Sequence, residues 1–232
     1  MNSEKLSNRL MVVASFVESG AIVADIGSDH AYLPCFLVNA CKINKAIAGE
    51  VVKGPYESAV KNVKKNGLDN AITVRLANGL HVIQEADAVD TVTIAGMGGP
   101  LIASILEEGS SQLQTVSRII AQPNIHALAI RQWAIKNNWQ LVDEEIIKED
   151  HKIYEVLVLE RGEASYNEAE MLVGPFLAKK RSSVFLEKWE RELVEWQRIV
   201  QELQQAGESS NILMKKRELQ TKIDLVRSVL SR

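Results

Sequence analysis

A polar turn follows an apolar run near the amino terminus of the chain. The run Val23–Ile26 carries an acid, Asp25, and is followed directly by Gly27, Ser28 and Asp29. In dinucleotide-binding folds this turn reads Gly-x-Gly-x-x-Gly, so that bare backbone can approach a pyrophosphate. Here only Gly27 remains, and a carboxylate at position 29 would repel a phosphate. The turn instead favours a ligand with a cationic centre and an amino-acid end, and S-adenosylmethionine is a ligand of this kind.

Two later strand candidates end in residues that suit a nucleoside. Lys45–Glu50 ends in an acid, and the acid at this position of nucleoside-binding units accepts hydrogen bonds from ribose hydroxyls. Ile72–Leu76 leads to Asn78 and Gly79, where the Asn side chain could meet an adenine edge. The spacing of these residues therefore predicts a nucleoside site beside the first polar turn.

A fourth strand candidate ends in a run of small residues. Thr91–Ala95 leads into Gly96–Gly99, which we expect to form a loop with room for another molecule. Open parallel sheets bind ligands beyond the carboxyl ends of their strands. We therefore expect all four strand ends to lie along one rim of a sheet.

The elements that must position these residues alternate in type. An amphipathic helix is expected over residues 6–17, and strands alternate with helices as far as the fifth strand, Arg118–Ala121, which is followed by Gln122-Pro123-Asn124. Gln140–Lys148 and Lys152–Glu160 are then separated by three residues, too few for a crossover helix. The predicted fold is α/β: a mostly parallel, Rossmann-like methyltransferase sheet closed by an antiparallel hairpin.

The rest of the chain has a helical pattern. One series of apolar residues runs from Phe185 to Leu203, and a second runs from Ile212 to Leu230, with the turn Ala206-Gly207-Glu208 between them. Both series have heptad-like spacing, which predicts an antiparallel helical hairpin forming a coiled-coil domain. The alternative is that both stripes pack on the catalytic core.

Composition limits the possible partners. The net charge of −3 excludes the strongly basic footprint of a nonspecific nucleic-acid binder, although one folded RNA could still be recognised through local patches. Lys179–Arg181 and Lys215–Arg217 are basic clusters, and a solvated face explains each as well as a phosphate site does. The two cysteines have no metal-ligand spacing, so no metal is expected. With no signal segment and no run long enough to span a membrane, we expect a soluble, cytoplasmic protein.

Several of these segments together resemble one known family. They are Leu6–Leu10, Ala24–Pro34, Gly49–Val51, Ile94–Gly99 and Gln122–Asn124. The string Gly-Ser-Asp-His-Ala-Tyr-Leu-Pro, taken with Ala-Gly-Met-Gly-Gly, is similar to the bacterial tRNA (adenine-22, N1)-methyltransferase family, TrmK. The resemblance covers essentially the whole chain.

The resemblance implies methyl transfer from S-adenosylmethionine to N1 of adenine 22 in tRNA. It implies a methyltransferase domain at residues 1–162 and a helical coiled-coil domain at residues 163–232 that helps to hold tRNA. Gly27, Ser28 and Asp29 would line the methionine end of the cofactor. The predicted cofactor-binding residues are Asp25, Gly27, Ser28, Asp29, His30, Glu50, Asn78, Gly79, Ala95 and Gly96, and the predicted catalytic residues are Asp29, Gly96 and Met97.

Methylation at N1 of adenine does not require a strong general base. The in-plane lone pair of N1 can attack a sulfonium methyl directly, so the enzyme must align the two atoms and stabilise a cationic product. Since N1 lies on the pairing edge, the base must be unpaired or flipped out, which costs a few kcal/mol. Asp29 or backbone carbonyls near Gly96 could hold the adenine amino group, and Tyr32 and Met97 could pack against the ring. His30 either accepts a hydrogen bond from the substrate or merely caps the turn.

Two other classes of function are compatible with the residues. One is a methyltransferase of the same fold that acts on a protein or a small molecule, with the helical tail as a lid or an oligomerisation element. The other is a noncatalytic module that binds the cofactor and recruits partners through the tail. No obligatory protein partner is expected from the sequence.

Overall fold

The computed structural model of the protein describes residues 5–207 and 209–231. The chain divides into two compact units, Met1–Ala164 and Ser165–Arg232. The division falls two residues beyond the expected limit of the first domain at residue 162.

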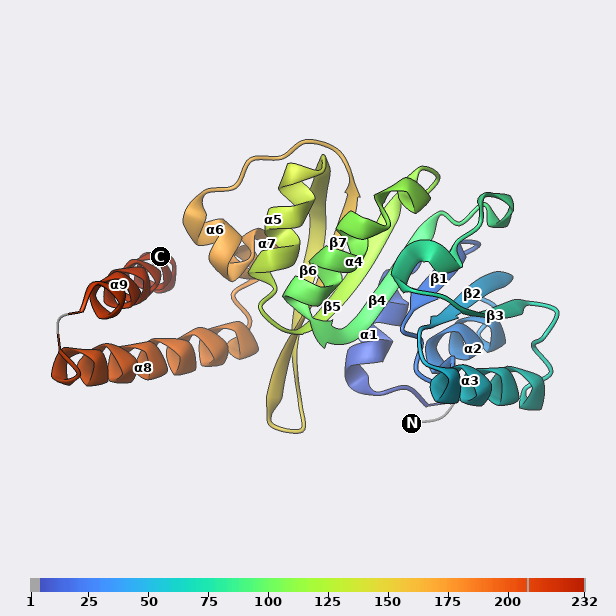
Figure 1. Cartoon of the computed structure of the whole chain (residues 1–232), viewed down its shortest axis with the longest axis horizontal. Coiled ribbons are helices and arrows are strands. Elements are labelled where there is room, and N and C mark those ends of the chain that lie inside the picture. Colours follow the sequence, from blue (N-terminus) through green and yellow to red (C-terminus); the bar gives the residue numbers. More distant parts are fainter. Residues whose placement is uncertain (1–4, 208, 232) are drawn as a thin grey trace. The chain divides into compact units, whose positions relative to one another are not determined.

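The first unit contains a mostly parallel sheet (Figure 1). Within the described residues it has seven strands in the order β3-β2-β1-β4-β5-β7-β6. All neighbours pair in parallel from β3 to β5, while β7 is antiparallel to both β5 and β6. The predicted fold class is confirmed. The strands are β1 Ile22–Ile26, β2 Lys45–Glu50, β3 Ile72–Leu76, β4 Thr91–Gly98, β5 Arg118–Ile125, β6 Trp139–Glu149 and β7 Lys152–Arg161.

The terminal hairpin has a tighter turn than expected. Glu149 pairs with Lys152, so only Asp150 and His151 lie between the strands. Both have positive φ, at 48° and 64°. Two left-handed residues are what a type I′ turn requires, and this turn matches the right-handed twist of the paired strands.

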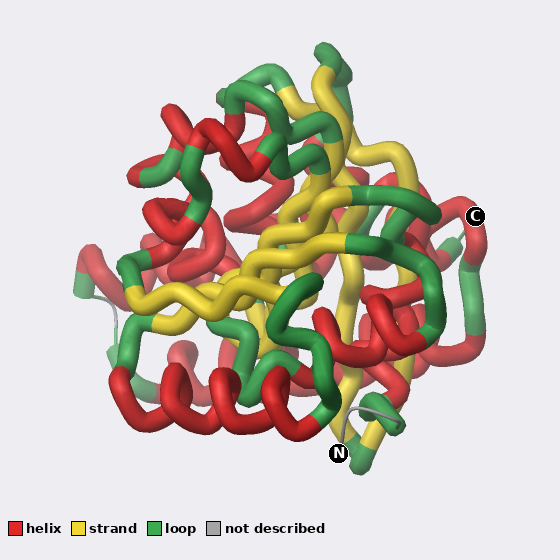
Figure 2. Tube along the Cα trace, turned by 90° about the vertical axis from the view of Figure 1, so that its right-hand side faces the viewer, coloured by secondary structure: helices red, strands yellow, loops and turns green. Residues whose placement is uncertain are grey.

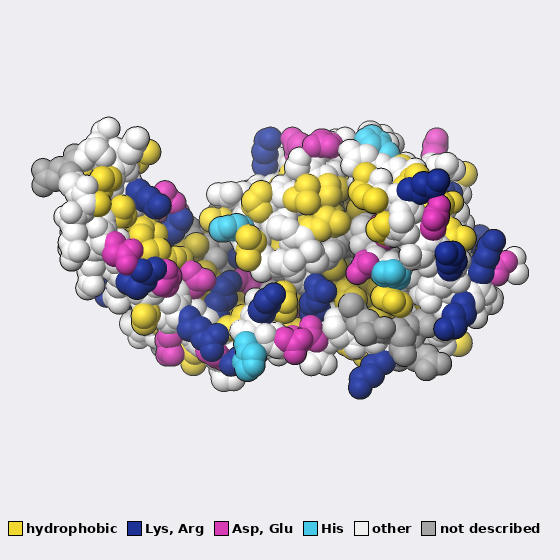
Figure 3. Space-filling view, turned by 60° about the horizontal axis from the view of Figure 1, so that its bottom comes forward, with side chains coloured by type: hydrophobic (Ala, Val, Ile, Leu, Met, Phe, Trp, Pro, Cys, Tyr) yellow, Lys and Arg dark blue, Asp and Glu magenta, His cyan; other side chains and the backbone are white. Residues whose placement is uncertain are grey.

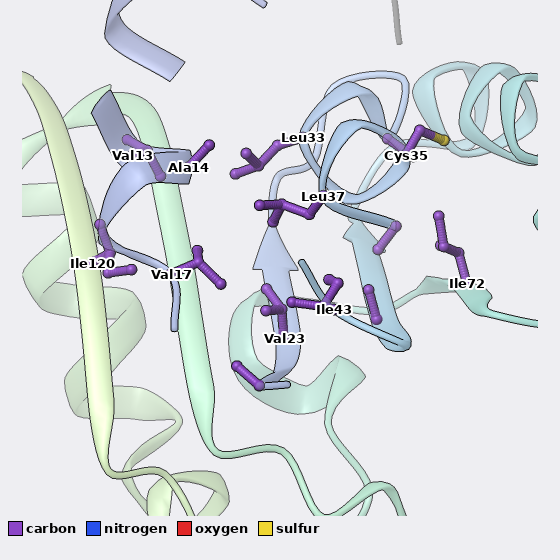
Figure 4. Close-up of a cluster of buried hydrophobic side chains, with 14 of the residues drawn as sticks. Val13, Ala14, Val17, Val23, Leu33, Cys35, Leu37, Ile43, Ile72 and Ile120 are labelled. Atoms are coloured by element: carbon purple, nitrogen blue, oxygen red, sulfur yellow. The ribbon is translucent and has the colours of Figure 1, made fainter. Parts of the chain in front are cut away.

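Helices cover both faces of the sheet (Figure 2). The helices of the first unit are α1 Asn8–Phe16, α2 Tyr32–Asn39, α3 Lys53–Lys65, α4 Gly99–Glu108 and α5 Leu128–Lys136, with short 3₁₀ segments η1 Gly79–Val82, η2 Glu85–Asp87 and η3 Ser110–Leu113. α1, α2 and α3 pack on one face, where their apolar side chains meet alternate residues of the strands (Figure 4). α4 and α5 pack together and against β4, β5 and β6.

Local signals account for where these helices begin and end. The Ser7 hydroxyl accepts a hydrogen bond from the Leu10 amide at the start of α1, as an N-cap residue does. Gly67, with φ of 68°, follows α3 in the left-handed conformation that its position requires. Pro100 lies in the first turn of α4, where its missing N–H costs no helical hydrogen bond.

β4 and β5 continue well beyond their predicted ends. β4 was expected to end at Ala95, but its pairing with β5 continues through Met97 and Gly98 with irregular register. The expected loop at Gly96–Gly99 is therefore wrong, because Gly98 still pairs and Gly99 already begins α4. β5 likewise continues past the predicted end at Ala121.

A buried ion cluster fastens α5 to the terminal hairpin. Arg131 on α5 is fully buried, and its Nε and Nη2 donate to Oε1 of Glu144 at 2.8 Å and 2.6 Å. Nη2 also lies 2.5 Å from Oε2 of Glu155. Burial alone would lower the pKa of Arg131, but the two carboxylates more than offset this and raise it. The guanidinium therefore stays charged inside the core.

The second unit is helical. Its helices are α6 Glu168–Val173, α7 Pro175–Lys180, α8 Ser183–Gln205 and α9 Ser210–Leu230. α8 and α9 form the predicted helical hairpin, with Val200, Leu219 and Ile223 buried between them. Glu208 of the predicted turn lies outside the described residues. The coiled-coil packing of the two helices stays a prediction.

Arg181 ties the start of this unit to its end. Its guanidinium donates to the carbonyl oxygens of Val229 at 2.7 Å and Leu230 at 3.0 Å. The last carbonyls of a helix lack intrahelical partners, so this contact caps α9. One member of the basic cluster Lys179–Arg181 is thus used structurally.

Within residues 5–207 and 209–231, no helix is long and apolar enough to cross a membrane. No group of three or more His, Cys, Asp or Glu side chains in the same ranges could hold a metal ion.

Candidate active site

The carboxyl ends of β1, β2, β3 and β4 meet at two adjoining cavities. The first cavity has a volume of about 270 Å³ and the second about 310 Å³. Gly27 and Met97 line both. The first cavity is also lined by Arg9, Leu10, Asp25, Ser28, Asp29, Tyr32, Leu33, Ala95 and Gly96, and the second by Ile26, Gly49, Glu50, Val51, Ala77, Asn78, Gly79, Leu101, Ser104, Ile105 and Glu108.

The turn after β1 is strained. Asp29, His30 and Ala31 have φ values of 42°, 69° and 56°, three successive non-glycine residues in the left-handed region. This conformation costs about 1–2 kcal/mol per residue, so the surroundings must hold it. The side chain of Asn62 on α3 does so by donating a hydrogen bond to the carbonyl oxygen of His30 at 2.8 Å. The turn presents Asp29, whose side chain is 72% exposed, beside the first cavity.

Asp25 is buried at the inner end of the first cavity. Its two carboxylate oxygens accept hydrogen bonds from the Ser28 hydroxyl at 2.5 Å and the Thr93 hydroxyl at 2.6 Å. Burial raises the pKa of Asp25 and these hydrogen bonds offset part of the rise. Ser28 is therefore bound to Asp25 within the protein, and the pair shapes the turn.

Glu50 ends β2 as predicted and lines the second cavity. The residue is 6% exposed, and its Oε1 is buried with no hydrogen-bond partner among the described residues. Burial raises the pKa of this carboxyl group, and a hydrogen bond from the backbone of Asp29 offsets part of the rise. A buried oxygen without a partner is costly. This oxygen could accept a hydrogen bond from a ligand, and the hydroxyl groups of a ribose are donors of that kind.

Two of the glycines in Gly96–Gly99 lie close to other parts of the protein. A Cβ at Gly99 would lie 2.0 Å from the carbonyl oxygen of His126, and one at Gly96 would lie 3.3 Å from Nη1 of Arg9. The protein itself takes the space at Gly99, whereas a Cβ at Gly98 would meet its first neighbour, Pro100, only at 4.0 Å. Gly96, with φ of 78°, is also held on both sides of its backbone.

Two residues that follow Ala121 form hydrogen bonds with the backbone of Gly96. Oε1 of the buried Gln122 accepts from the Gly96 amide at 3.2 Å, and Nδ2 of Asn124 donates to the Gly96 carbonyl at 2.7 Å. The carbonyl of Gly96, expected as an acceptor for the adenine amino group, already has a partner within the protein. Its oxygen retains a second lone pair.

Met97 lies where the two cavities meet. A Cβ on Gly27 would come within 2.2 Å of the terminal methyl carbon of Met97, which could move aside, so it is the φ of 66° that favours glycine at position 27. The half-buried Met97 side chain therefore adjoins both cavities.

The predicted residues are thus brought together with one exception. His30 does not line either cavity, and α2 begins only at Tyr32 with no side-chain cap. Ala31 occupies the cap position of α2, so His30 does not cap that helix. The His30 ring instead stacks on Tyr32 at 5.3 Å, and its Nε2 lies 3.5 Å from Asp29.

Sequence reasoning missed other residues of the site. Arg9 reaches the first cavity from α1, and Leu101, Ser104, Ile105 and Glu108 reach the second from α4. The α4 residues recur at helical spacing, which could have indicated one face of a helix. No spacing signal links Arg9 to the strand ends.

Comparison with known proteins shows which family the chain belongs to. The chain matches the tRNA (adenine(22)-N(1))-methyltransferase family, TrmK, over residues 23–228. The chain belongs to the TrmK family. It is 49% identical over 236 residues to the tRNA (adenine(22)-N(1))-methyltransferase of Bacillus subtilis, covering 99% of both chains. The resemblance inferred from the motifs is confirmed.

Solved TrmK structures have the same fold. The B. subtilis TrmK crystal structure is 47% identical and superposes with a TM-score of 0.93, covering 97% of this chain and 99% of that one. A Streptococcus pneumoniae protein, solved in complex with S-adenosyl-L-methionine, is 46% identical with a TM-score of 0.89 and covers 97% and 100%.

Proposed function

We propose that this TrmK protein methylates N1 of adenine 22 of tRNA where the first and second cavities meet. S-adenosylmethionine would supply the electrophilic methyl group. One observation supports this placement: Oε1 of Glu50 is buried without a hydrogen-bond partner among the described residues, and Glu50 lines the second cavity together with Asn78 and Gly79. The ribose and adenine of the cofactor fit these residues, and its amino-acid end fits the acids of the first cavity.

The residues at the meeting point suit alignment rather than proton abstraction. Met97 adjoins both cavities and offers a polarisable, uncharged surface to a cationic centre. Asp29, whose exposed side chain lines the first cavity, can accept a hydrogen bond from the adenine amino group and oppose the positive charge that forms on the methylated base. N1 needs no general base, because its lone pair is available.

The position of methylation tests the proposal directly. Incubation with methyl-labelled cofactor should label unmodified tRNA, and a transcript with guanine at position 22 should take up no label. Parallel samples of protein extract and of small metabolites should also stay unlabelled. Label in either of those samples, or undiminished label in the position-22 variant, would contradict the proposed substrate.

The basic cluster Lys215–Arg217 on α9 is our candidate for a tRNA phosphate contact. Its members form no ion pair within the described residues, whereas Arg198 on α8 is paired with Glu195 and Glu202. This cluster is therefore the better electrostatic site for a phosphate.

Replacing Lys215, Lys216 and Arg217 with alanine should weaken tRNA binding. Loss of up to three phosphate contacts should reduce the slope of log affinity against log salt by up to about three units. The measurement is a salt titration of tRNA binding by fluorescence anisotropy. Arg198→Ala is the matched control and should leave the slope unchanged, and equal slopes for wild type and triple variant would remove the cluster from the interface.

A further inference from the structure

Asn124 lies beside the point where the first and second cavities meet. It follows Pro123 on β5, which pairs with Met97 at the end of β4. The next residue, Ile125, pairs with Gly98. Asn124 therefore lies opposite the end of β4, where Met97 adjoins both cavities. A side chain at this position borders the space that a target base must enter to meet the methyl group.

The amide of Asn124 has a defined orientation although the residue is exposed. Its Nδ2 donates a hydrogen bond to the carbonyl oxygen of Gly96 at 2.7 Å. Its Oδ1 accepts from Nε2 of Gln122 at 3.5 Å, which is a long contact. Within the described part of the chain these two atoms have no other partner. One hydrogen of Nδ2 and a lone pair of Oδ1 are therefore available to a ligand.

Gln122 sets this orientation. Its Oε1 accepts from the Gly96 amide at 3.2 Å and from Nη1 of Arg9 at 3.0 Å, so Oε1 must face these donors. Nε2 then faces the Pro123 carbonyl oxygen, at 2.9 Å, and Oδ1 of Asn124. The Gln122 side chain is buried, which shields these contacts from water. The protein thus holds the Asn124 amide in one sense before any ligand binds.

Exposed apolar side chains lie at the same edge of the sheet. Val51 follows β2, Leu76 ends β3, Leu101 follows β4 and Ile125 ends β5, and each is 49–64% exposed. Figure 3 shows apolar side chains gathered on one face of the first unit. A nucleic-acid base combines an apolar ring face with a polar edge. An edge of the sheet with exposed apolar residues and an oriented amide therefore suits a base.

We propose that Asn124 recognises the target adenine through the edge that carries N6 and N7. This inference rests on the proposed function. Oδ1 accepts a hydrogen bond from the N6 amino group, and the second hydrogen of Nδ2 is donated to N7, which is the bidentate pairing that Asn forms with adenine in nucleic acids. N1 lies on the other side of the amino group, so it stays free to attack the methyl group.

The same amide discriminates against guanine. Guanine carries an oxygen at position 6, which would face Oδ1 of Asn124 as one acceptor against another. Turning the amide over would bring Oδ1 against the carbonyl oxygen of Gly96, so the hydrogen bond to Gly96 opposes that change. Asp29 keeps its proposed role, because the amino group has two hydrogens and Asp29 can accept the one on the N1 side.

The test compares three tRNA transcripts that differ only at position 22. One carries adenine, one carries purine without the amino group, and one carries 7-deazaadenine without N7. Asn124→Ala should slow single-turnover methylation of the adenine transcript about tenfold to a hundredfold. The loss should be smaller with each analogue, because one of the two contacts is already absent there. The ratio of wild-type to variant rate cancels the different intrinsic reactivity of N1 in the three bases.

Two controls separate recognition from structure. Asn70→Ala removes the same amide from an exposed turn before β3, at the opposite edge of the sheet, and should change none of the rates. The affinity of Asn124→Ala for S-adenosylhomocysteine, measured by calorimetry, should equal that of the wild type. Asn124 lines neither cavity, and the Gly96 amide keeps its hydrogen bond to Gln122.

Three results would overturn the inference. An undiminished loss with either analogue would mean that Asn124 acts through the backbone of Gly96 and not on the base. An unchanged rate with the adenine transcript would leave Asn124 without a role, and a fall in S-adenosylhomocysteine affinity that matches the fall in rate would assign it to the cofactor. If the wild-type chain failed to methylate the adenine transcript, the proposed function itself would be wrong, and this inference with it.

Discussion

Glu50→Ala is expected to lower the affinity for S-adenosylmethionine by about tenfold to a hundredfold. The carboxylate is expected to accept hydrogen bonds from the ribose hydroxyls, and losing charge-assisted bonds of this kind costs about 1.5–3 kcal/mol. The buried Oε1 that lacks a partner is the reason to expect a large effect, since the site is already desolvated. Calorimetry with S-adenosylhomocysteine, which avoids turnover, measures the change.

In the unliganded protein, the Glu50 carboxylate should lower the free energy of unfolding at neutral pH. Burial raises the folded-state pKa of Glu50 above its ordinary value of 4.5, so the folded protein holds this proton more tightly than the unfolded chain does. The free energy of unfolding contributed by Glu50 therefore falls as the pH rises from about 4.5 through the raised pKa. Glu50→Gln removes that loss and should raise the thermal midpoint at neutral pH while weakening cofactor binding. Unchanged binding with unchanged stability would remove Glu50 from the site.

Arg131→Met is expected to lower the free energy of unfolding by about 3–5 kcal/mol. Removing one partner of a buried ion cluster leaves uncompensated charge in the core, and here both Glu144 and Glu155 would lose the guanidinium between them. Chemical denaturation at neutral pH measures the effect. Because the cluster joins α5 to the β6–β7 hairpin, the far end of the sheet should lose hydrogen-exchange protection first.

A matched set of variants isolates the cause. Replacing Arg131, Glu144 and Glu155 together with Met, Leu and Leu should restore most of the stability, because apolar side chains of similar volume need no charge partner. Arg198→Ala, which breaks the exposed ion pairs with Glu195 and Glu202, should leave the stability nearly unchanged. If the triple variant were as unstable as Arg131→Met, lost packing and not uncompensated charge would be the cause.

Local sequence patterns determined most of the fold and part of the site. Each strand of the parallel sheet appears as a short apolar run, and the hairpin follows from two such runs with too few residues between them for a helix. Glu50, Asn78 and Gly96 are found for the same reason, since a residue that follows a strand must lie at the carboxyl edge of a parallel sheet. The apolar series in residues 185–230 likewise predicted α8 and α9.

Only the tertiary structure decided which side chains share a cavity. Arg9 and Gln122 are 113 residues apart, and their contact arises because α1 packs against β5. The left-handed turn at Asp29, His30 and Ala31 runs against local propensity and depends on Asn62 from another helix. Such contacts depend on packing between distant segments, whereas periodicity and turn residues act over a few neighbours. For that reason the strand ends were predictable, and the cation in the first cavity and the oxygen of Glu50 without a partner were not.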